Sequence, residues 1–201
     1  MSTDFKTSET KTNLMRAFAG ESQARGRYDF AAKAAGEQKL YVVEALFRFT
    51  AKQEQAHAKV FYDRLKAFDG GEIAADGSYP VNLTASVAGL LRSAAANERR
   101  EHDEVYAAFA ETAQREDFPE VAADFRNIAA IEQLHGERFT KFAELLESGK
   151  LFVADAECAW MCLNCGHVQT TKAAPELCPV CGHDRGFFIR LSMTPWGVEK
   201  G

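Results

Sequence analysis

Four stretches of this sequence place glutamates where apolar residues would be expected. Each stretch repeats apolar residues at alternating steps of three and four, the pattern of a helix face that packs into a core. Two of the stretches also carry a histidine three residues after the glutamate, which puts both side chains on one side of a helix. The candidate metal-binding residues are Glu21, Glu54, His57, Glu98, Glu101, Glu132 and His135.

Buried carboxylates cost several kcal/mol unless they are paired, and several in one core also repel one another. The face positions of the four stretches hold no lysine or arginine, so metal ions are the favoured partners. One glutamate from each of two helices, with Glu-x-x-His from each of two others, is the pattern of carboxylate sites for two iron ions. A single Glu-x-x-His usually lies on a solvated face, but four in-register sites favour a dinuclear metal centre.

Two tyrosines, Tyr28 and Tyr106, lie within two turns of these candidate ligands. They either pack in the core or form hydrogen bonds to the ligands and relay protons or radicals. The third stretch continues the apolar face from Glu101 to Val105 and Ala108. His102 follows Glu101 at about 100° around a helix, so we expect it outside the ligand set.

The spacing of the glutamates indicates an internal repeat. Glu54 follows Glu21 by 33 residues, and Glu132 follows Glu98 by 34 residues. Each helix pair therefore supplies half of the site.

All five cysteines fall between Cys158 and Cys181. Cys162-x-x-Cys165-Gly and Cys178-x-x-Cys181-Gly, with twelve residues between the pairs, predict a tetrahedral four-cysteine site for zinc or iron. Zinc would be structural, whereas iron would carry one electron. Cys158 is left as an unpaired thiol. Because the first 157 residues have no cysteine, metal binding in a reducing compartment fits better than a disulfide scaffold.

These residues require long helices to position them. The predicted helices cover Thr10–Ala35, Leu40–Phe68, a stretch from the cap Asn82 to Glu116, and a stretch after Asp117 that ends at Gly149. Gly36 is the expected first residue beyond the first helix. Pro119 lies in the first turn of the fourth helix, where Glu120 completes a capping-box pattern.

The connections between these helices predict their arrangement. Two are short and predict antiparallel hairpins, whereas residues 69–81 are long enough to cross the bundle. The fold class is an all-α four-helix bundle of ferritin-like topology over residues 1–150. A small metal-knuckle domain with a short tail follows over residues 151–201. A segment of that size needs its metal to fold.

Composition excludes several other classes. The 201 residues carry a net charge of −5, which disfavours nucleic acid as a partner. The longest purely apolar run has six residues, so we expect no membrane span. The polar N-terminus has no apolar export signal, and a cytoplasmic location is expected.

A carboxylate bundle followed by cysteine knuckles resembles the rubrerythrin family. Ala19–Arg25 is similar to that family's first-helix motif, and Ala174–Pro179 is similar to its second knuckle. The resemblance implies a C-terminal rubredoxin-like domain that holds iron, with zinc possible in purified protein. It also implies that Glu54 and Glu132 bridge two irons. Glu21 would bind the first iron, Glu98 and His135 the second, and Glu101 and His57 would alternate on the first between the diferric and diferrous states. Relatives often carry tyrosine at the position of His102.

The implied activity is reduction of hydrogen peroxide to water in oxidative-stress protection. Electrons come from a reductase or rubredoxin through the four-cysteine iron, and the family commonly forms homodimers. Two alternatives stay open. One is a ferritin-type ferroxidase or iron-handling protein, which a dedicated electron-input domain disfavours. The other is a non-enzymatic zinc-ribbon interaction protein.

Overall fold

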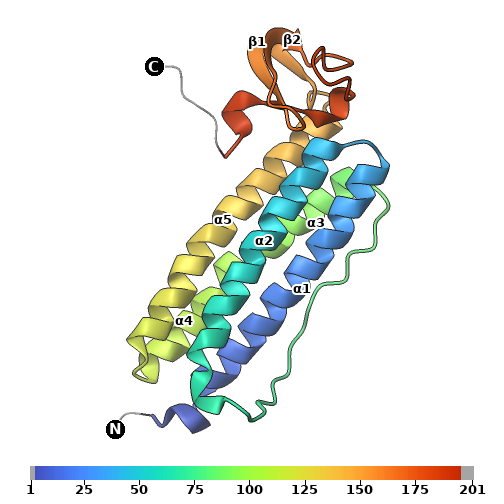
Figure 1. Cartoon of the computed structure of the whole chain (residues 1–201). Coiled ribbons are helices and arrows are strands. Elements are labelled where there is room, and N and C mark those ends of the chain that lie inside the picture. Colours follow the sequence, from blue (N-terminus) through green and yellow to red (C-terminus); the bar gives the residue numbers. More distant parts are fainter. Residues whose placement is uncertain (1–2, 196–201) are drawn as a thin grey trace.

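The structure is a computed structural model that describes residues 3–195, so the end of the predicted tail lies outside it. The long helices are α1 (Glu9–Glu37), α2 (Tyr41–Arg64), α3 (Val87–Arg100), α4 (Tyr106–Arg115) and α5 (Pro119–Glu147). The extended crossover segment, residues 69–86, runs along the bundle beside α1 (Figure 1). The predicted bundle with one long crossover is confirmed.

The end of α1 differs from the prediction. The helix continues through Gly36 to Glu37, and the left-handed residue that closes it is Lys39, with φ 58°. Leu40 then donates its N–H to the Ala35 carbonyl at 2.9 Å. Gly36 serves close packing instead, because a Cβ there would lie 2.5 Å from a carboxylate oxygen of Glu44.

The second and third helices also have different limits from those predicted. α2 stops at Arg64, and a 3₁₀ turn covers Lys66–Phe68. Ser86, not Asn82, caps α3, because the Ser86 hydroxyl accepts the Gly89 N–H at 3.3 Å. The Asn82 side chain contacts α3 farther along instead, where its Oδ1 accepts a hydrogen bond from Asn97 Nδ2 at 3.0 Å. That bond ties the crossover segment to α3.

The fourth predicted helix begins as expected at Pro119 but lacks the capping box. Phe118 occupies the cap position without a side-chain hydrogen bond, and Asp117 has φ 71°. Glu120 Oε2 instead accepts a hydrogen bond from Arg64 Nη1 of α2 at 2.9 Å.

A π-helical turn, Glu101–Val105, interrupts the single helix predicted between residues 82 and 116. A π turn adds one residue, so later side chains are displaced by about 100° around the axis. The predicted apolar face through Val105 and Ala108 is therefore wrong. The residues buried beyond the turn are Tyr106, Ala110 and Ala113.

Two apolar clusters fill the bundle. Along each of the four predicted helical stretches, the candidate glutamates lie between these two clusters. The cluster nearer the C-terminal domain contains Tyr28, Phe47, Leu91, Phe139 and Phe142. The other contains Leu14, Phe61, Tyr106, Phe125 and Ile128. The polar layer is thus sealed from water at both ends.

The C-terminal part is a three-stranded antiparallel sheet of β1 (Val153–Cys162), β2 (Val168–Ala173) and β3 (Phe188–Arg190), with β1 in the middle. Trp160 and Phe188 are fully buried and pack with Cys162 and Cys178 in its small core.

This sheet docks on the end of the bundle where α1 turns into α2 (Figure 1). The rings of Tyr41 and Phe187 stack with centroids 4.1 Å apart. Leu151 and Ile189 pack into the bundle's own apolar cluster. Because the two parts share this core, the boundary at residue 150 stays a prediction. No helix within residues 3–195 has the length and apolarity needed to cross a membrane.

Candidate metal centres

The bundle brings six of the seven predicted bundle ligands into two groups. One group contains Glu21, Glu54, His57 and Glu132, and the other contains Glu54, Glu98, Glu132 and His135. Within each group one donor atom per residue lies within 4.8 Å of every other. Glu54 and Glu132 belong to both groups. The pattern therefore describes two adjacent metal positions that share two carboxylates.

The distances repeat on the two sides of the centre. His57 Nδ1 lies 3.0 Å from Glu54 Oε2 and 2.9 Å from Glu132 Oε1. His135 Nδ1 lies 3.0 Å from Glu54 Oε1 and 2.8 Å from Glu132 Oε2. Each shared carboxylate therefore turns one oxygen to each side, as a bridging carboxylate must. The outer carboxylates complete the sides, with Glu21 Oε2 3.8 Å from His57 and Glu98 Oε2 3.7 Å from His135.

Six of the atoms that could bind metal are buried without hydrogen-bond partners among the described residues. They are Glu21 Oε2, Glu54 Oε1, Glu98 Oε2, both Glu132 oxygens and His135 Nδ1. Leaving one buried polar atom unpaired costs about 1–3 kcal/mol, and more for a charged group. Bound cations would satisfy all of these atoms at once, so the residues fit a pair of metal ions.

Electrostatics explains why this layer needs cations. Burial, reinforced by the neighbouring carboxylates, raises the pKa values of Glu21 and Glu98 well above the usual range. Burial works against the charged form of His57, but the carboxylates of Glu132 and Glu54, 2.9 and 3.0 Å from its Nδ1, outweigh it and raise its pKa to about 9. Burial opposes ionisation of Glu132 as well, yet the two histidines lower its pKa to about 2. In the metal-free protein, protons bound to these carboxyl and imidazole groups thus provide the positive charge that metal ions would otherwise supply.

Both predicted tyrosines contact ligand residues rather than only packing in the core. Tyr28, from α1, donates its hydroxyl hydrogen to Glu98 Oε1, and Tyr106, from α4, donates to Glu21 Oε1. In each case the carboxylate keeps its Oε2 atom turned toward the metal position. Each tyrosine therefore comes from one helix pair and contacts a glutamate of the other pair.

Glu101 lies beside these groups but belongs to neither of them. Glu101 lines a cavity at the start of the π turn. Burial, with the charges of Glu132 and Glu54, raises its pKa to about 8. His102 pairs with the Asp103 carboxylate at 2.6 Å on the outer side of the turn, away from both groups, as expected.

Sequence reasoning missed the hydrogen bond behind His135. Its Nε2 lies 3.1 Å from Gln53 Oε1, which also accepts from Arg138 NH1 at 3.3 Å. Such a bond fixes the ring so that Nδ1 faces the metal position. Gln53 belongs to no recognisable motif. Its position directly before the candidate ligand Glu54 is the only sequence signal that could have pointed to this role.

The four predicted cysteines gather in the C-terminal domain. Cys162, Cys165, Cys178 and Cys181 lie within 4.8 Å of one another. The sulfurs of Cys162 and Cys181 are 3.7 Å apart, and those of Cys165 and Cys178 are 3.6 Å apart. Four sulfurs at about 2.3 Å from a central ion would have edges of about 3.8 Å, so the group fits a tetrahedral ion.

Backbone geometry prepares each cysteine knuckle for metal binding. Gly166 and Gly182 have φ of 76° and 72°, a conformation that other residues rarely adopt. The turns allow backbone N–H groups to point at sulfur, and the one from His183 is the main reason that the pKa of Cys181 falls to about 5. Cys158 lies in β1 opposite Thr171, outside the four-cysteine group.

Fold and sites together define a ferritin-like bundle with a carboxylate–histidine centre for two metal ions and a separate four-cysteine centre. Residues 12–144 match the family description Rubrerythrin, and residues 160–189 match Rubrerythrin, rubredoxin-like domain. The chain belongs to the rubrerythrin family. Its cofactors are accordingly two iron ions in a carboxylate-bridged site and one iron ion in a four-cysteine site, and it is an iron-dependent redox protein.

Individual relatives agree with this assignment. The rubrerythrin of Porphyromonas gingivalis is 44% identical over 188 residues, 94% of this chain and 92% of that protein. A solved structure described as a mixed-valence state of nigerythrin is 27% identical, with a TM-score of 0.61, and covers 94% of this chain and 92% of its own. The bacterioferritin of Mycobacterium tuberculosis is 17% identical, with a TM-score of 0.62, over 74% of this chain and 90% of its own, and it shares the fold alone.

Proposed function

We propose that this protein is a non-haem di-iron peroxidase that reduces hydrogen peroxide to water in oxidative-stress protection. Electrons are relayed from a reductase or a rubredoxin through the four-cysteine iron. The observation that carries the proposal is the pair of four-residue groups sharing Glu54 and Glu132, in one chain with a four-cysteine group. An electron-input domain suits repeated turnover, which iron storage does not require.

The proposed ligand roles follow the two groups. Glu54 and Glu132 would be shared by both ions, Glu21 and His57 would hold one of them, and Glu98 and His135 would hold the other. Glu101 takes the place of His57 in the oxidised state. A carboxylate suits Fe(III) and a neutral imidazole suits Fe(II), so this exchange keeps the charge of the centre nearly constant. The position of Glu101 beside the groups supports this role.

When bound, the two ferrous ions supply the two electrons that hydrogen peroxide needs. Peroxide also takes up two protons to give two molecules of water, and this chain can hold one of them. Glu101 lines the cavity, and in the metal-free protein burial, with the charges of Glu132 and Glu54, raises its pKa to about 8, so its carboxyl is suited to take up and release a proton. Tyr28 and Tyr106 have raised pKa values through burial, stay neutral, and orient Glu98 and Glu21.

A homodimer in the cytoplasm belongs to the proposal. Tyr41, where the C-terminal domain docks, and Glu54 are 13 residues apart on α2, which corresponds to about 20 Å along the helix. Electrons travelling within one chain would have to cover that length. A second copy that places its own four-cysteine domain against the side of the bundle shortens the route.

The test is stopped-flow mixing of fully reduced, iron-loaded protein with hydrogen peroxide and, separately, with dissolved oxygen. The visible colour of the oxidised four-cysteine iron reports the outcome. We expect fast return of colour with peroxide and slow return with oxygen. The Cys165→Ser variant is the control, since it lacks the coloured centre and reveals any absorbance that does not come from it.

Other results point to the alternatives. Faster oxidation by oxygen than by peroxide, with a mineral core in the purified protein, would contradict the peroxidase and favour iron handling. A colourless four-cysteine site that contains zinc would instead favour a structural role for that domain.

A further inference from the structure

A cavity of about 300 Å³ lies between the crossover segment and the bundle. Its inner wall includes Glu101 and Tyr106, both of which adjoin the dinuclear centre. Its outer wall includes Tyr79 of the crossover segment, and Ala108 of α4 is an exposed residue on its lining. The cavity therefore leads from the surface of the molecule to the carboxyl of Glu101.

The ring of Tyr79 has a defined seat beside this cavity. Gly77 makes room for it, because a Cβ there would lie 2.6 Å from the Tyr79 hydroxyl oxygen, and the ring also lies against α1 at Gly20. The hydroxyl donates to the Arg16 carbonyl at 3.2 Å. Tyr79 is thus held in one position against α1.

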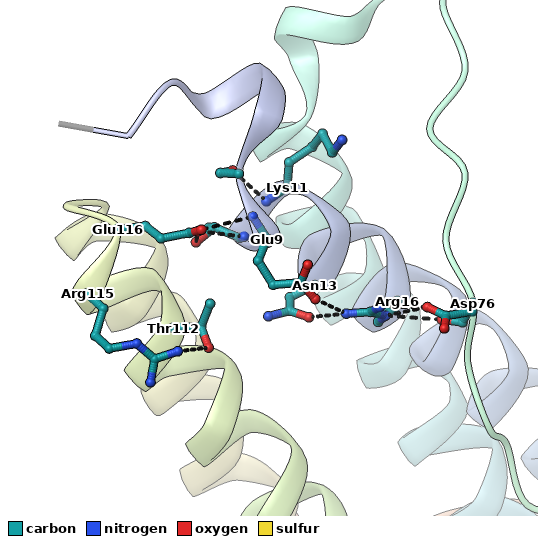
Figure 2. A network of polar contacts seen from close by, with 10 residues as sticks. Glu9, Lys11, Asn13, Arg16, Asp76, Thr112, Arg115 and Glu116 are labelled. Atoms are coloured by element: carbon teal, nitrogen blue, oxygen red, sulfur yellow. Dashed lines mark hydrogen bonds and ion pairs between the residues drawn. The ribbon is translucent and has the colours of Figure 1, made fainter. Parts of the chain in front are cut away.

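The crossover segment is anchored on both sides of Tyr79. Figure 2 shows Arg16 reaching from α1 to Asp76, whose carboxylate lies 2.6 Å from Arg16 NH2. The bond between Asn82 and Asn97 fixes the other side at 3.0 Å. Tyr79 therefore lies on a short extended segment that is anchored on both sides, and it can act as a stable constriction.

The charges at the cavity favour an uncharged solute. Its two lining cations, Arg16 and Arg100, already face carboxylates: Arg16 pairs with Glu9 and Asp76, and Arg100 Nε lies 3.7 Å from Glu104. An anion entering this space would meet Glu101 and Glu104 without a cation that is free to receive it. A neutral hydroperoxide is not repelled by these carboxylates.

We propose that this cavity is the passage by which neutral hydroperoxides reach Glu101, and that Tyr79 limits their size. The inference rests on the proposed peroxidase function. A hydroperoxide ROOH takes two electrons from the ferrous pair and two protons, its O–O bond breaks, and ROH and water leave. For hydrogen peroxide, R is hydrogen. A bulky R group must pass Tyr79 to bring its O–O bond to Glu101.

The test compares Tyr79→Ala, Ala108→Trp and a control, Leu83→Ala, on the same crossover segment. Leu83 is 91% exposed and does not line the cavity. Reduced, iron-loaded protein is mixed with hydrogen peroxide or with cumene hydroperoxide. We expect Tyr79→Ala to raise the second-order rate constant for cumene hydroperoxide about tenfold, with less than about threefold change for hydrogen peroxide. Ala108→Trp should lower both constants about fivefold or more, and the control should match wild type.

A second measurement does not depend on turnover. Xenon occupies apolar cavities, so crystals of the iron-loaded protein under xenon pressure should show xenon between Tyr79 and Tyr106. The Ala108→Trp crystals should show none there. Circular dichroism and sedimentation of each variant confirm that fold and assembly are unchanged.

The results separate the passage from the peroxidase itself. If wild-type protein is not oxidised by hydrogen peroxide, the proposed function fails and the passage fails with it, whatever xenon shows. If wild type reacts but Tyr79→Ala and Ala108→Trp keep wild-type rates with both hydroperoxides, the passage is overturned and the peroxidase stands.

Discussion

Removal of the metal ions should make the bundle lose stability as the pH rises from 5 to 8. The cause is the set of protons that replace the ions in the buried layer. A group whose pKa is raised by folding binds its proton more tightly in the folded state. Its contribution to stability is complete below the unfolded pKa and is lost as the pH rises through the folded pKa. Glu101 loses its contribution between 4.5 and about 8, and His57 between 6.5 and about 9.

The size of the effect follows from these ranges. Each pH unit between the unfolded and folded pKa of one group costs about 1.4 kcal/mol. Glu101 alone therefore accounts for about 4 kcal/mol between pH 5 and 8. Glu132 does not offset this loss, because its lowered pKa acts between 4.5 and about 2, below the range considered. A loss of about 4 kcal/mol is a large part of a typical stability of about 5–15 kcal/mol.

The assay is urea unfolding of chelator-treated protein at pH 5, 6.5 and 8, followed by the helical circular dichroism signal. That signal reports the bundle, since the C-terminal domain is built on strands. Glu101→Gln should reduce the loss by about 4 kcal/mol, whereas the control Glu104→Gln, at an exposed neighbour, should leave it unchanged. The iron-loaded protein should show the opposite trend, because protons compete with metal for the same atoms. Metal-free protein that is as stable at pH 8 as at pH 5 would refute the reasoning.

Three further substitutions test other parts of the molecule. Glu101→Ala should slow peroxide turnover about tenfold or more with unchanged helix content, and Glu104→Ala should not; equal steady-state rates would contradict the ligand exchange. Cys165→Ser should abolish the visible absorption of the four-cysteine iron, and metal analysis should show that the bundle keeps its two iron ions. Loss of iron from both centres would contradict independent sites. Gly186→Ala should displace the C-terminal domain, because its Cβ would lie 1.9 Å from the Lys39 carbonyl oxygen; unchanged susceptibility to limited proteolysis near residue 150 would argue against that.

The sequence was sufficient to predict the bundle and, apart from Glu101, the residues that gather at both centres. Glutamates inside apolar faces have few physical explanations, and their 33- and 34-residue spacing placed them in one layer. The paired C-x-x-C motifs were equally specific. These predictions depended on local periodicity and spacing, which a sequence states directly.

Features that depend on tertiary contacts were not predictable in the same way. The apolar face beyond Glu101 was placed one residue out, since periodicity assumes an unbroken α-helix and a π turn has no strong compositional signal. The cap at Asn82 was wrong because a partner on α3 competed for its side chain. The docking of the C-terminal domain depends on Tyr41 and Phe187, which are far apart in the chain.

The π turn carries a consequence for the ancestry of the fold. The second helix pair is longer than the first by one residue between its glutamates, and one residue is what a π turn adds. Without it, the glutamates of the two halves would have the same spacing. The π turn accommodates the extra residue, so Tyr106 is buried as Tyr28 is, whereas the counterpart of Glu101 in the first half is Ala24. In a duplicated ancestor, a single inserted codon would account for the difference in spacing, and the difference between Glu101 and Ala24 would account for the two inequivalent metal positions.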